Sequence, residues 1–478
     1  MWGWSTAALR LVLMHKLDPS TFTRNKGKCD LISVEDVVKE IDKLPRTRRR
    51  GPSACPSFSL KASTIRPYQW EAVRAAHKKS GFIIAPCGAG KTLIGLLAAT
   101  GNGGRFLVLT SRYAEQWRQT LSAHFCPVGS AKVAILGQDA IRLASPPDVI
   151  IATYSGLSAR STSIDARALR FLPYHTLVLD EAHAAASPNN LAVVDSIFAS
   201  HVLALTATKV REDAELEKLE ERIGGTLVAI DRTRLVKEGF VSDVRCINLV
   251  VPYGGELEAT IGRTASLALD SNKIQVLCST LRRLDADSHK TLVFCDDLFC
   301  LHWANRMVTA FGIKTIGCVS MQTAVDQRAT LIQTFGATEG GAILFVSRTG
   351  DEALDVPNAT AGLVFWNHWG SRRQMVQRLG RIARISDGGP PPTFIVLLAQ
   401  DETEMERSEH RERYVKEHGF CCQTAAQDTT VFGTLCRQTN ATYVKRVATE
   451  WKEAGRKIKG GGSDSLHGRP ARKRRRAP

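Results

Sequence analysis

The chain has 478 residues, of which 44% are hydrophobic and 23% are charged, and its formal net charge at pH 7 is +17. This length predicts two to three domains, and the apolar fraction excludes a mainly disordered protein. No run approaches the roughly 18 uncharged apolar residues that a transmembrane helix needs, which excludes such a helix.

The positive charge is concentrated at the two ends. Residues 1–64 contain 12 Lys and Arg against 6 Asp and Glu, residues 441–478 contain 12 against 3, and residues 65–440 are almost neutral at +2. A basic chain is typical of nucleic-acid binding, although solvated tails give the same balance. The last ten residues, RPARKRRRAP, favour a nuclear-localisation signal over a solvated or DNA-binding tail. The first 17 residues contain no acid, so an organellar transit peptide stays open.

The twelve cysteines do not form a metal-binding or disulfide pattern. None belongs to a Cys-x2-Cys pair, which argues against a zinc ribbon. In a chain of this length they are too sparse for a disulfide scaffold, and we expect reduced thiols in the cytosol or nucleus.

Short apolar runs recur along the body of the chain and predict strands. The first half contains runs at 81–86, 105–110, 148–153, 176–181 and 202–208, and the second at 291–296, 315–320, 342–347, 362–367 and 393–399. Such runs suit strands buried on both faces of a parallel sheet. Segments of helical period, such as 112–125 and 301–312, lie between them, so the pattern predicts two doubly wound α/β lobes.

These runs also set the predicted domain boundaries. We expect one lobe at 65–235 and a second at 276–425, joined by a charge-rich connector at 236–275, with a ligand site in the cleft between the lobes. A basic N-terminal extension precedes them at 1–64. A basic C-terminal extension follows at 426–478, with a flexible linker at 459–465.

A phosphate-binding loop follows the first predicted strand. Residues 85–92 have the sequence APCGAGKT, which matches the P-loop pattern except that Ala85 replaces the first glycine. Glycines let backbone N–H groups turn toward phosphates, and a following helix adds partial positive charge. We expect the phosphates to be held by Pro86, Cys87, Gly88, Ala89, Gly90 and Lys91. The Thr92 hydroxyl would ligate Mg²⁺ beside ATP.

An acidic motif ends the fourth predicted strand. Residues 180–183 have the sequence DEAH, and unpaired carboxylates at the end of a buried strand are costly unless they serve a purpose. Asp180 would hold Mg²⁺, and Glu181 would orient and deprotonate an attacking water. His183 could sense the state of the phosphate, or it could merely contact the start of a helix. Together with the P-loop, this motif predicts ATP hydrolysis.

Two further motifs narrow the kind of ATPase. Thr206 and Thr208 close the next strand, where their hydroxyls could bond the acidic motif. Gln377 begins the sequence QRLGRIAR, in which Arg381 and Arg384 share one face of a predicted helix. Arginines that face a nucleotide across a cleft stabilise phosphoryl transfer.

The order of these motifs resembles superfamily 2 helicases with two RecA-like lobes. Additional stretches resemble the xeroderma pigmentosum group B (XPB) family, the translocase subunit of transcription factor TFIIH. They include IRPYQ at 65–69, EQW at 115–117, RED at 211–213 and GSRRQ at 370–374. The resemblance extends over residues 65–420.

The resemblance implies further roles. Arg66 and Gln69 would lie at the adenine, and Thr110 and Arg112 would touch the nucleic-acid backbone. A segment that links DNA to the nucleotide would contain Ser347, Thr349, Gly350 and Asp351. The loop that separates the duplex would contain Arg211, Glu212 and Asp213. The family's polarity is 3′ to 5′.

The sequence also departs from the family. Only 64 residues precede Ile65, where family members carry a long N-terminal region, and the thumb-like segment near 250–275 is short. The sequence therefore does not decide whether the protein binds duplex DNA firmly or docks to TFIIH. Both a compact paralogue and a viral homologue fit the size.

We therefore expect a monomeric, ATP- and Mg²⁺-dependent DNA helicase or translocase of transcription or repair. It would act on single-stranded and duplex DNA in the nucleus, with partners of the TFIIH type and no membrane association. A duplex translocase that does not itself unwind, the motor of a restriction-type complex, and an RNA-directed helicase are the alternatives. A non-hydrolysing scaffold would not need the intact Lys91, Asp180 and Glu181.

Overall fold

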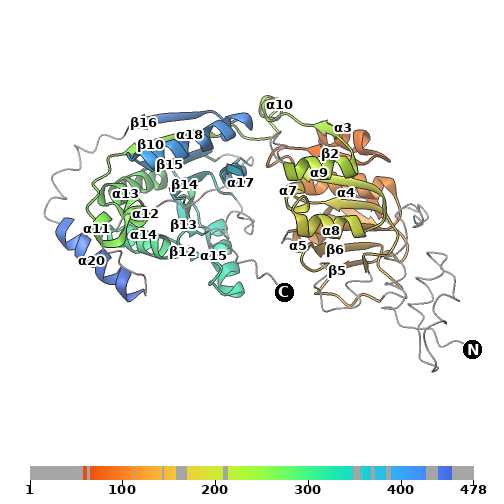
Figure 1. Ribbon diagram of the computed structural model, residues 1–478, viewed down its shortest axis with the longest axis horizontal. Helices are drawn as coiled ribbons and strands as arrows, with labels where there is room; N and C mark the ends of the chain where they lie inside the picture. The colour runs from red at the N-terminus through yellow and green to blue at the C-terminus, as the bar shows by residue number, and fades with distance from the viewer. Residues whose placement is uncertain are drawn as a thin grey trace, which may run out of the picture. The chain divides into compact units, whose positions relative to one another are not determined.

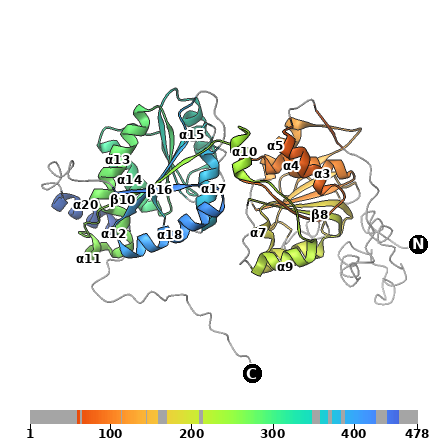
Figure 2. The same ribbon diagram turned by 90° about the horizontal axis from the view of Figure 1, so that it is seen from above.

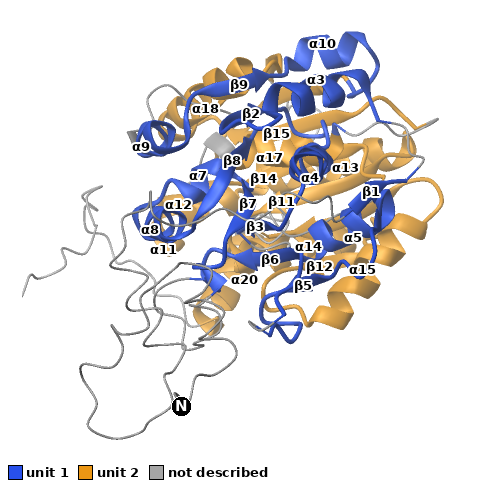
Figure 3. Ribbon diagram, turned by 90° about the vertical axis from the view of Figure 1, so that its right-hand side faces the viewer, with its two compact units in different colours: residues 1–242, 383–385 blue, residues 243–382, 386–478 orange. Residues whose placement is uncertain are grey.

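The computed structural model describes residues 58–61, 65–111, 114–142, 145–157, 169–207, 214–347, 356, 358–367, 372–383, 389–426 and 440–454. The chain divides into two compact units, each of which is described by itself (Figure 3). Unit 1 comprises residues 1–242 with 383–385, and unit 2 comprises residues 243–382 with 386–478. The domain boundaries expected from the sequence stay predictions.

Unit 1 is built on a parallel sheet of seven strands. In spatial order the strands are β5 (Val133–Ile135), β6 (Val149–Thr153), β3 (Phe106–Thr110), β7 (Tyr174–Leu179), β8 (Ala199–Thr206), β2 (Gly81–Ile84) and β9 (Thr226–Ala229). A separate antiparallel pair joins β1 (Phe58–Leu60) to β4 (Phe125–Pro127). The central strands β3, β6 and β7 are buried almost throughout because helices cover both faces of the sheet.

Different helices cover the two faces of this sheet, as Figure 2 shows. One face carries α3 (Pro67–Ala76), α4 (Lys91–Asn102) and α5 (Ala114–His124). The other carries α7 (Ala182–Ala185), α8 (Pro188–Ser196) and α9 (Ala214–Ile223), which form a buried cluster with side chains of the central strands. This layering leaves the carboxyl edge of the sheet to the loops that hold the predicted motifs.

Unit 2 repeats the same architecture. Its seven parallel strands, in spatial order, are β12 (Gly317–Val319), β13 (Ala342–Val346), β11 (Lys290–Cys295), β14 (Ala361–Trp366), β15 (Thr393–Ala399), β10 (Arg245–Val251) and β16 (Cys422–Ala426). When only the seven strands of each large sheet are numbered in chain order, both sheets have the spatial order 3-4-2-5-6-1-7. The prediction of two α/β lobes on one plan is therefore confirmed.

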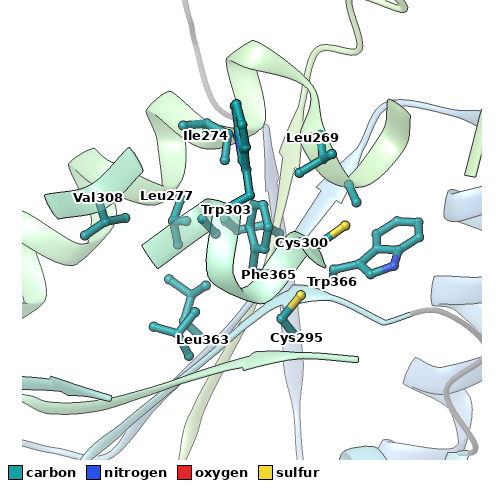
Figure 4. Close-up of a cluster of buried hydrophobic side chains, with 14 of the residues drawn as sticks. Leu269, Ile274, Leu277, Cys295, Cys300, Trp303, Val308, Leu363, Phe365 and Trp366 are labelled. Atoms are coloured by element: carbon teal, nitrogen blue, oxygen red, sulfur yellow. The ribbon is translucent and has the colours of Figure 1, made fainter. Parts of the chain in front are cut away.

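The helices of unit 2 also form two layers (Figure 1). On one face, α11 (Glu258–Ile261), α12 (Arg263–Leu269), α13 (Ser271–Ala286) and α14 (Leu298–Ala310) enclose the cluster drawn in Figure 4. The other layer contains α17 (Arg372–Ile382) and α18 (Glu402–Glu417), and α15 (Val325–Ala337) packs against β12 and β13.

Helix α20 (Asn440–Glu453) packs against this core within the predicted C-terminal extension. Val447 is buried, and the rings of Trp451 and Phe299 meet edge to face with centroids 5.0 Å apart. No helix among the described residues is long and apolar enough to cross a membrane.

All ten strands predicted from the sequence are present, and among the described residues six others were missed: the antiparallel pair β1 and β4, and strands β5, β9, β10 and β16 of the two large sheets. Strands β5, β9 and β16 lie at or beside sheet edges, and β9 and β16 carry largely half-exposed or exposed side chains. Strand β10 lies in the predicted connector, and in its sequence RCINLVV the polar residues Arg245 and Asn248 interrupt the apolar run. These strands lack the continuous apolar signal of strands that are covered on both faces.

Candidate active site

The carboxyl edge of the unit 1 sheet gathers four of the predicted sequence motifs. Strands β2, β3, β7 and β8 end at Ile84, Thr110, Leu179 and Thr206. Parallel strands present their carboxyl ends at the same edge, where open α/β sheets bind ligands. The P-loop follows β2 and the acidic motif follows β7, so the fold brings them together.

The P-loop leads from β2 into the N-terminus of α4. Ala85 N–H donates to the Thr206 carbonyl at 3.0 Å, which ties the loop to the end of β8. Gly88 and Gly90 have φ angles of +85° and +76°, a region that side-chain-bearing residues rarely adopt. Lys91 begins the helix, and its Nζ lies 3.4 Å from the Ala85 carbonyl oxygen. The first turn of a helix leaves N–H groups without intrahelical partners, which suits a phosphate.

Helix α3 supports the P-loop from behind through two side chains. The Tyr68 hydroxyl and Gln69 Nε2 both donate to the Ala89 carbonyl, at 3.0 and 3.2 Å. Gln69 Oε1 accepts from the Arg66 N–H at 3.0 Å, which caps the helix. The positive φ of Gly90 favours glycine, and a Cβ built there would lie 2.8 Å from Gln69 Nε2, so a side chain would also push this amide away from the Ala89 carbonyl.

Asp180 is held by donors from two other elements. Its Oδ2 accepts from the Thr110 hydroxyl and from the Trp117 indole N–H, both at 3.0 Å. Burial, and next the neighbouring Glu181 carboxylate, raise the pKa of Asp180, while the two hydrogen bonds and the charge of Lys91 act in the opposite direction. The orientation of this carboxylate is therefore fixed by the tertiary structure.

Glu181 has a left-handed backbone conformation with φ of +50°, which is strained for a residue with a side chain. Such strain is concentrated at functional sites because the surrounding structure must impose it. Here the Tyr154 hydroxyl donates to the Asp180 carbonyl at 3.0 Å, just before the strained residue. His183 Nδ1 lies 3.4 Å from Glu181 Oε2, so the predicted base and the predicted sensor touch.

The residues present fit a divalent cation bound with a triphosphate. Burial and, to a smaller extent, the adjacent Glu181 carboxylate raise the pKa of Asp180. A cation would stabilise the charged carboxylate, because positive charge offsets both effects. Oxygen ligands are those that Mg²⁺ prefers. Thr92, in the first turn of α4, and Asp180 would hold it.

In unit 2, the predicted arginine motif lies on α17. Gln377 and Arg381 are half-buried on this helix. Arg378 is fully buried, and its Nη2 pairs with Asp296 Oδ1 at 2.5 Å, while Gln374 donates to the same oxygen at 3.2 Å. Asp296 therefore connects α17 to the end of β11.

Ser347, another predicted residue, follows β13, and its N–H donates to the Val319 carbonyl at 2.9 Å.

Several predicted site residues lie outside the described part of the chain. They are Arg112, Thr208, Arg211, Glu212, Asp213, Thr349, Gly350, Asp351 and Arg384. Sequence reasoning also overlooked three side chains that the structure places at the site, namely Tyr68, Trp117 and Tyr154. All three lie within stretches of the family resemblance, namely IRPYQ at 65–69, EQW at 115–117 and ATYS at 152–155, so the resemblance was the available signal.

Comparisons with known proteins agree with these motifs. Residues 235–449 match the family described as ERCC3/RAD25/XPB C-terminal helicase, and residues 62–211 match the type III restriction enzyme res subunit. The chain is 30% identical to the general transcription and DNA repair factor IIH helicase/translocase subunit XPB/SSL2 of Saccharomyces cerevisiae, over 83% of this chain and 48% of that protein. It is 29% identical to the DNA repair helicase/translocase XPB-R of Trypanosoma brucei brucei, over 77% of this chain and 56% of that protein.

The chain thus spans about half the length of the curated relatives it matches. Among solved structures, the Hef helicase domain of Pyrococcus furiosus superposes with a TM-score of 0.52 at 16% identity, covering 72% of this chain and 98% of that one. This likeness supports RecA-like lobes as the fold. The resemblance drawn from the motifs is therefore confirmed: the chain is similar to XPB helicase/translocase subunits over most of its own length, and its two units have the RecA-like fold.

Proposed function

We propose that this chain is an ATP-dependent DNA helicase or translocase. The observation that supports it most is the carboxyl edge of unit 1, where the P-loop and an Asp180 carboxylate fixed by Thr110 and Trp117 meet. Lys91 is close enough to Asp180 to favour the charged form of that carboxylate. This arrangement suits the binding and hydrolysis of a nucleoside triphosphate.

Each residue of this edge has a defined task in the proposed reaction. The backbone N–H groups of the P-loop and of the first turn of α4 would bind the phosphates, with Lys91 on the β- and γ-phosphates. Glu181 would orient the attacking water and accept its proton. Mg²⁺ held at Thr92 and Asp180 would neutralise charge on the phosphoryl oxygens. His183, in contact with Glu181, would respond to the loss of the γ-phosphate.

The sequence QRLGRIAR at 377–384 would complete the hydrolytic machinery. Arg381 and Arg384 would stabilise the charge that develops on the transferred phosphoryl group, and Gln377 would support them. This role rests on the sequence motif and on the half-buried position of Arg381 on α17, a helix that Asp296 fastens to the sheet.

DNA is the proposed track because the relatives carry names of DNA repair and transcription. A machinery of the TFIIH type and a nuclear location are proposed on the same basis, and the basic run at 469–478 is proposed as the signal. Deleting residues 463–478 should reduce nuclear accumulation or duplex binding and preserve basal ATP hydrolysis, because it leaves α20 intact.

Nucleic-acid-stimulated ATP hydrolysis tests the proposal. Steady-state rates would be measured without nucleic acid and with single-stranded DNA, duplex DNA or RNA. DNA should stimulate the wild-type protein, and Glu181→Gln should abolish turnover while ATP still binds. A rate of ATP hydrolysis that DNA does not increase, or that only RNA increases, would contradict the proposal. Stimulation by duplex DNA without strand separation would favour a translocase.

A further inference from the structure

The last segment of unit 1, residues 231–242, packs beside the nucleotide motifs. It contains α10 (Arg232–Lys237) and a turn closed by the Phe240 N–H, which donates to the Leu235 carbonyl at 2.8 Å. The chain passes into unit 2 at Asp243. This connecting segment is therefore a covalent link between the units, and a change at the ATP site that reaches it can act on the rest of the chain.

A continuous series of contacts runs from the P-loop to this segment. The Tyr68 hydroxyl donates to the Ala89 carbonyl at 3.0 Å and accepts from Arg66 Nη1 at 3.2 Å. The same Arg66 nitrogen donates to the Phe240 carbonyl at 2.8 Å, and the guanidinium lies 5.3 Å from the centre of the Phe240 ring. Four residues thus connect the loop that binds phosphate with the segment that leaves the unit.

Packing contacts reinforce the same route. The rings of Tyr68 and Phe240 are tilted against each other with centroids 5.3 Å apart. A Cβ built on Gly88 would lie 3.9 Å from Val241 Cγ1, so Val241 lies beside the P-loop itself. Tyr68 is fully buried and Val241 is 3% exposed, so these contacts are shielded from water.

The first half of the segment is fastened to α3 in addition. Arg234 makes a bidentate pair with Glu71 at 2.8 and 2.9 Å, at a position where both side chains are largely exposed. Exposed pairs of this kind contribute little energy, so we expect the contacts of the half-buried Phe240 and the buried Val241 to contribute more. The position of the segment therefore depends mainly on its contacts with Arg66, Tyr68 and the P-loop.

We propose that the Tyr68 hydroxyl is the central link of a relay that carries nucleotide occupancy of the P-loop to residues 231–242. A triphosphate in the loop fixes the Ala89 peptide, which fixes the Tyr68 hydroxyl, the Arg66 guanidinium and Phe240 in turn. The inference rests on the proposed nucleotide site and deepens it, because it names the path by which binding is felt outside the site. Tyr68 acts through its neighbours and is a positioning residue.

Hydrogen exchange of backbone amides tests the relay in the full chain. Exchange would be measured over residues 231–242 with and without a non-hydrolysable ATP analogue and Mg²⁺. Site-to-site coupling is typically worth about 5- to 150-fold, so the analogue should slow exchange of this segment at least about fivefold in the wild type. Exchange reports local opening and does not require a change in the average structure.

Tyr68→Phe removes the hydroxyl and preserves the ring that packs on Phe240. Analogue binding, followed by calorimetry, should weaken by less than about tenfold, since one neutral hydrogen bond is lost. The slowing of exchange over 231–242 should fall below about twofold. Tyr443→Phe is the matched control, because the buried Tyr443 hydroxyl also donates to a carbonyl, that of Leu269, and accepts from a side chain, Trp303. This variant should keep the wild-type response.

The outcomes separate the relay from the proposed function. The relay is wrong if the analogue slows exchange over residues 231–242 equally in the wild type and in Tyr68→Phe. It is also wrong if the analogue binds to the wild type but does not change exchange in this segment. In both cases the proposed ATP site is unaffected. If the wild type binds no analogue, or Lys91→Ala binds it and hydrolyses ATP like the wild type, the proposed function fails first.

Discussion

Trp117→Phe removes one of the two hydrogen bonds that hold the Asp180 carboxylate. The indole N–H donates to Oδ2 at 3.0 Å, and Trp117 is 1% exposed. The phenyl ring fills the inner part of the same buried position but lacks the indole Cη2, which lies against α4, where a Cβ built on Gly95 would be 3.0 Å from it. Because Thr110 still donates to the same oxygen, the Asp180 carboxylate becomes less rigidly oriented but keeps its position.

The size of the effect follows from the charge of the acceptor. Hydrogen bonds to charged groups contribute about 1.5–3 kcal/mol, and the remaining Thr110 bond offsets part of this. We expect a loss of about 1–2 kcal/mol in transition-state stabilisation, which corresponds to roughly 5- to 30-fold in kcat/KM for ATP. The Mg²⁺ concentration that gives half-maximal rate should rise, because Asp180 would hold the ion less firmly.

Steady-state ATP hydrolysis at saturating DNA and varied Mg²⁺ measures this change. Trp303→Phe is the matched control, since Trp303 is also 1% exposed and its indole N–H donates at 3.2 Å, but to Tyr443 in unit 2. It should lower stability without changing the Mg²⁺ dependence. If Trp117→Phe keeps kcat/KM and Mg²⁺ dependence within twofold of wild type, the Trp117 bond does not position Asp180.

Three further changes test other parts of the structure. Asp296→Asn removes the charge opposite the buried Arg378, which should cost about 3–5 kcal/mol and lower the Tm by roughly 10 °C in calorimetry. Burial lowers the pKa of His175 and of His201 below the unfolded value of about 6.5. Below about pH 6.5 the unfolded state therefore binds more protons than the folded state. The contribution of the two neutral histidines to stability is complete above this pH and is lost as the pH falls. His201→Gln should flatten urea unfolding energies between pH 5 and 7. Gly90→Ala should weaken ATP binding about tenfold in titration calorimetry, because a φ of +76° costs a residue with a side chain about 1–2 kcal/mol and the new methyl group would displace Gln69 Nε2, 2.8 Å away.

Each of these expectations has a control or a contrary outcome. Asp195→Asn breaks an exposed pair with Arg222 and should cost less than about 1 kcal/mol, and an equal loss in both variants would mean that burial is not the cause. An unchanged pH slope in His201→Gln would show that this histidine does not contribute to acid sensitivity. Wild-type ATP affinity in Gly90→Ala would mean that the loop adjusts to a side chain.

The central strands and the motif loops could be predicted from the sequence because each is a local signal. Runs such as FLVLT at 106–110 are apolar throughout, since helices cover both faces of the sheet. The P-loop occupies eight consecutive residues, 85–92, and the DEAH motif occupies four, 180–183, so each can be recognised without knowledge of the fold. Of the four strands at the edges of the two large sheets, β12 was predicted and β5, β9 and β16 were missed. An edge position tolerates polar side chains, which weakens the apolar signal of β9 and β16.

The supporting side chains were missed because their partners are distant in the sequence. Trp117 lies 63 positions from Asp180, and Tyr154 lies 26 positions from it. Similarly, the helix 372–382 carries several arginines that look equivalent in the sequence. Only the tertiary structure shows that Arg378 is buried against Asp296 while Arg381 stays half-buried.

ATP-driven displacement of a third strand from duplex DNA tests the proposed motor most directly, because a protein moving along the duplex must strip the triplex-forming oligonucleotide. The wild type should release it only with ATP and Mg²⁺, and Lys91→Ala and Glu181→Gln should not release it. DNA-stimulated hydrolysis without displacement, or displacement without ATP, would contradict the assignment of the chain as an ATP-driven DNA motor.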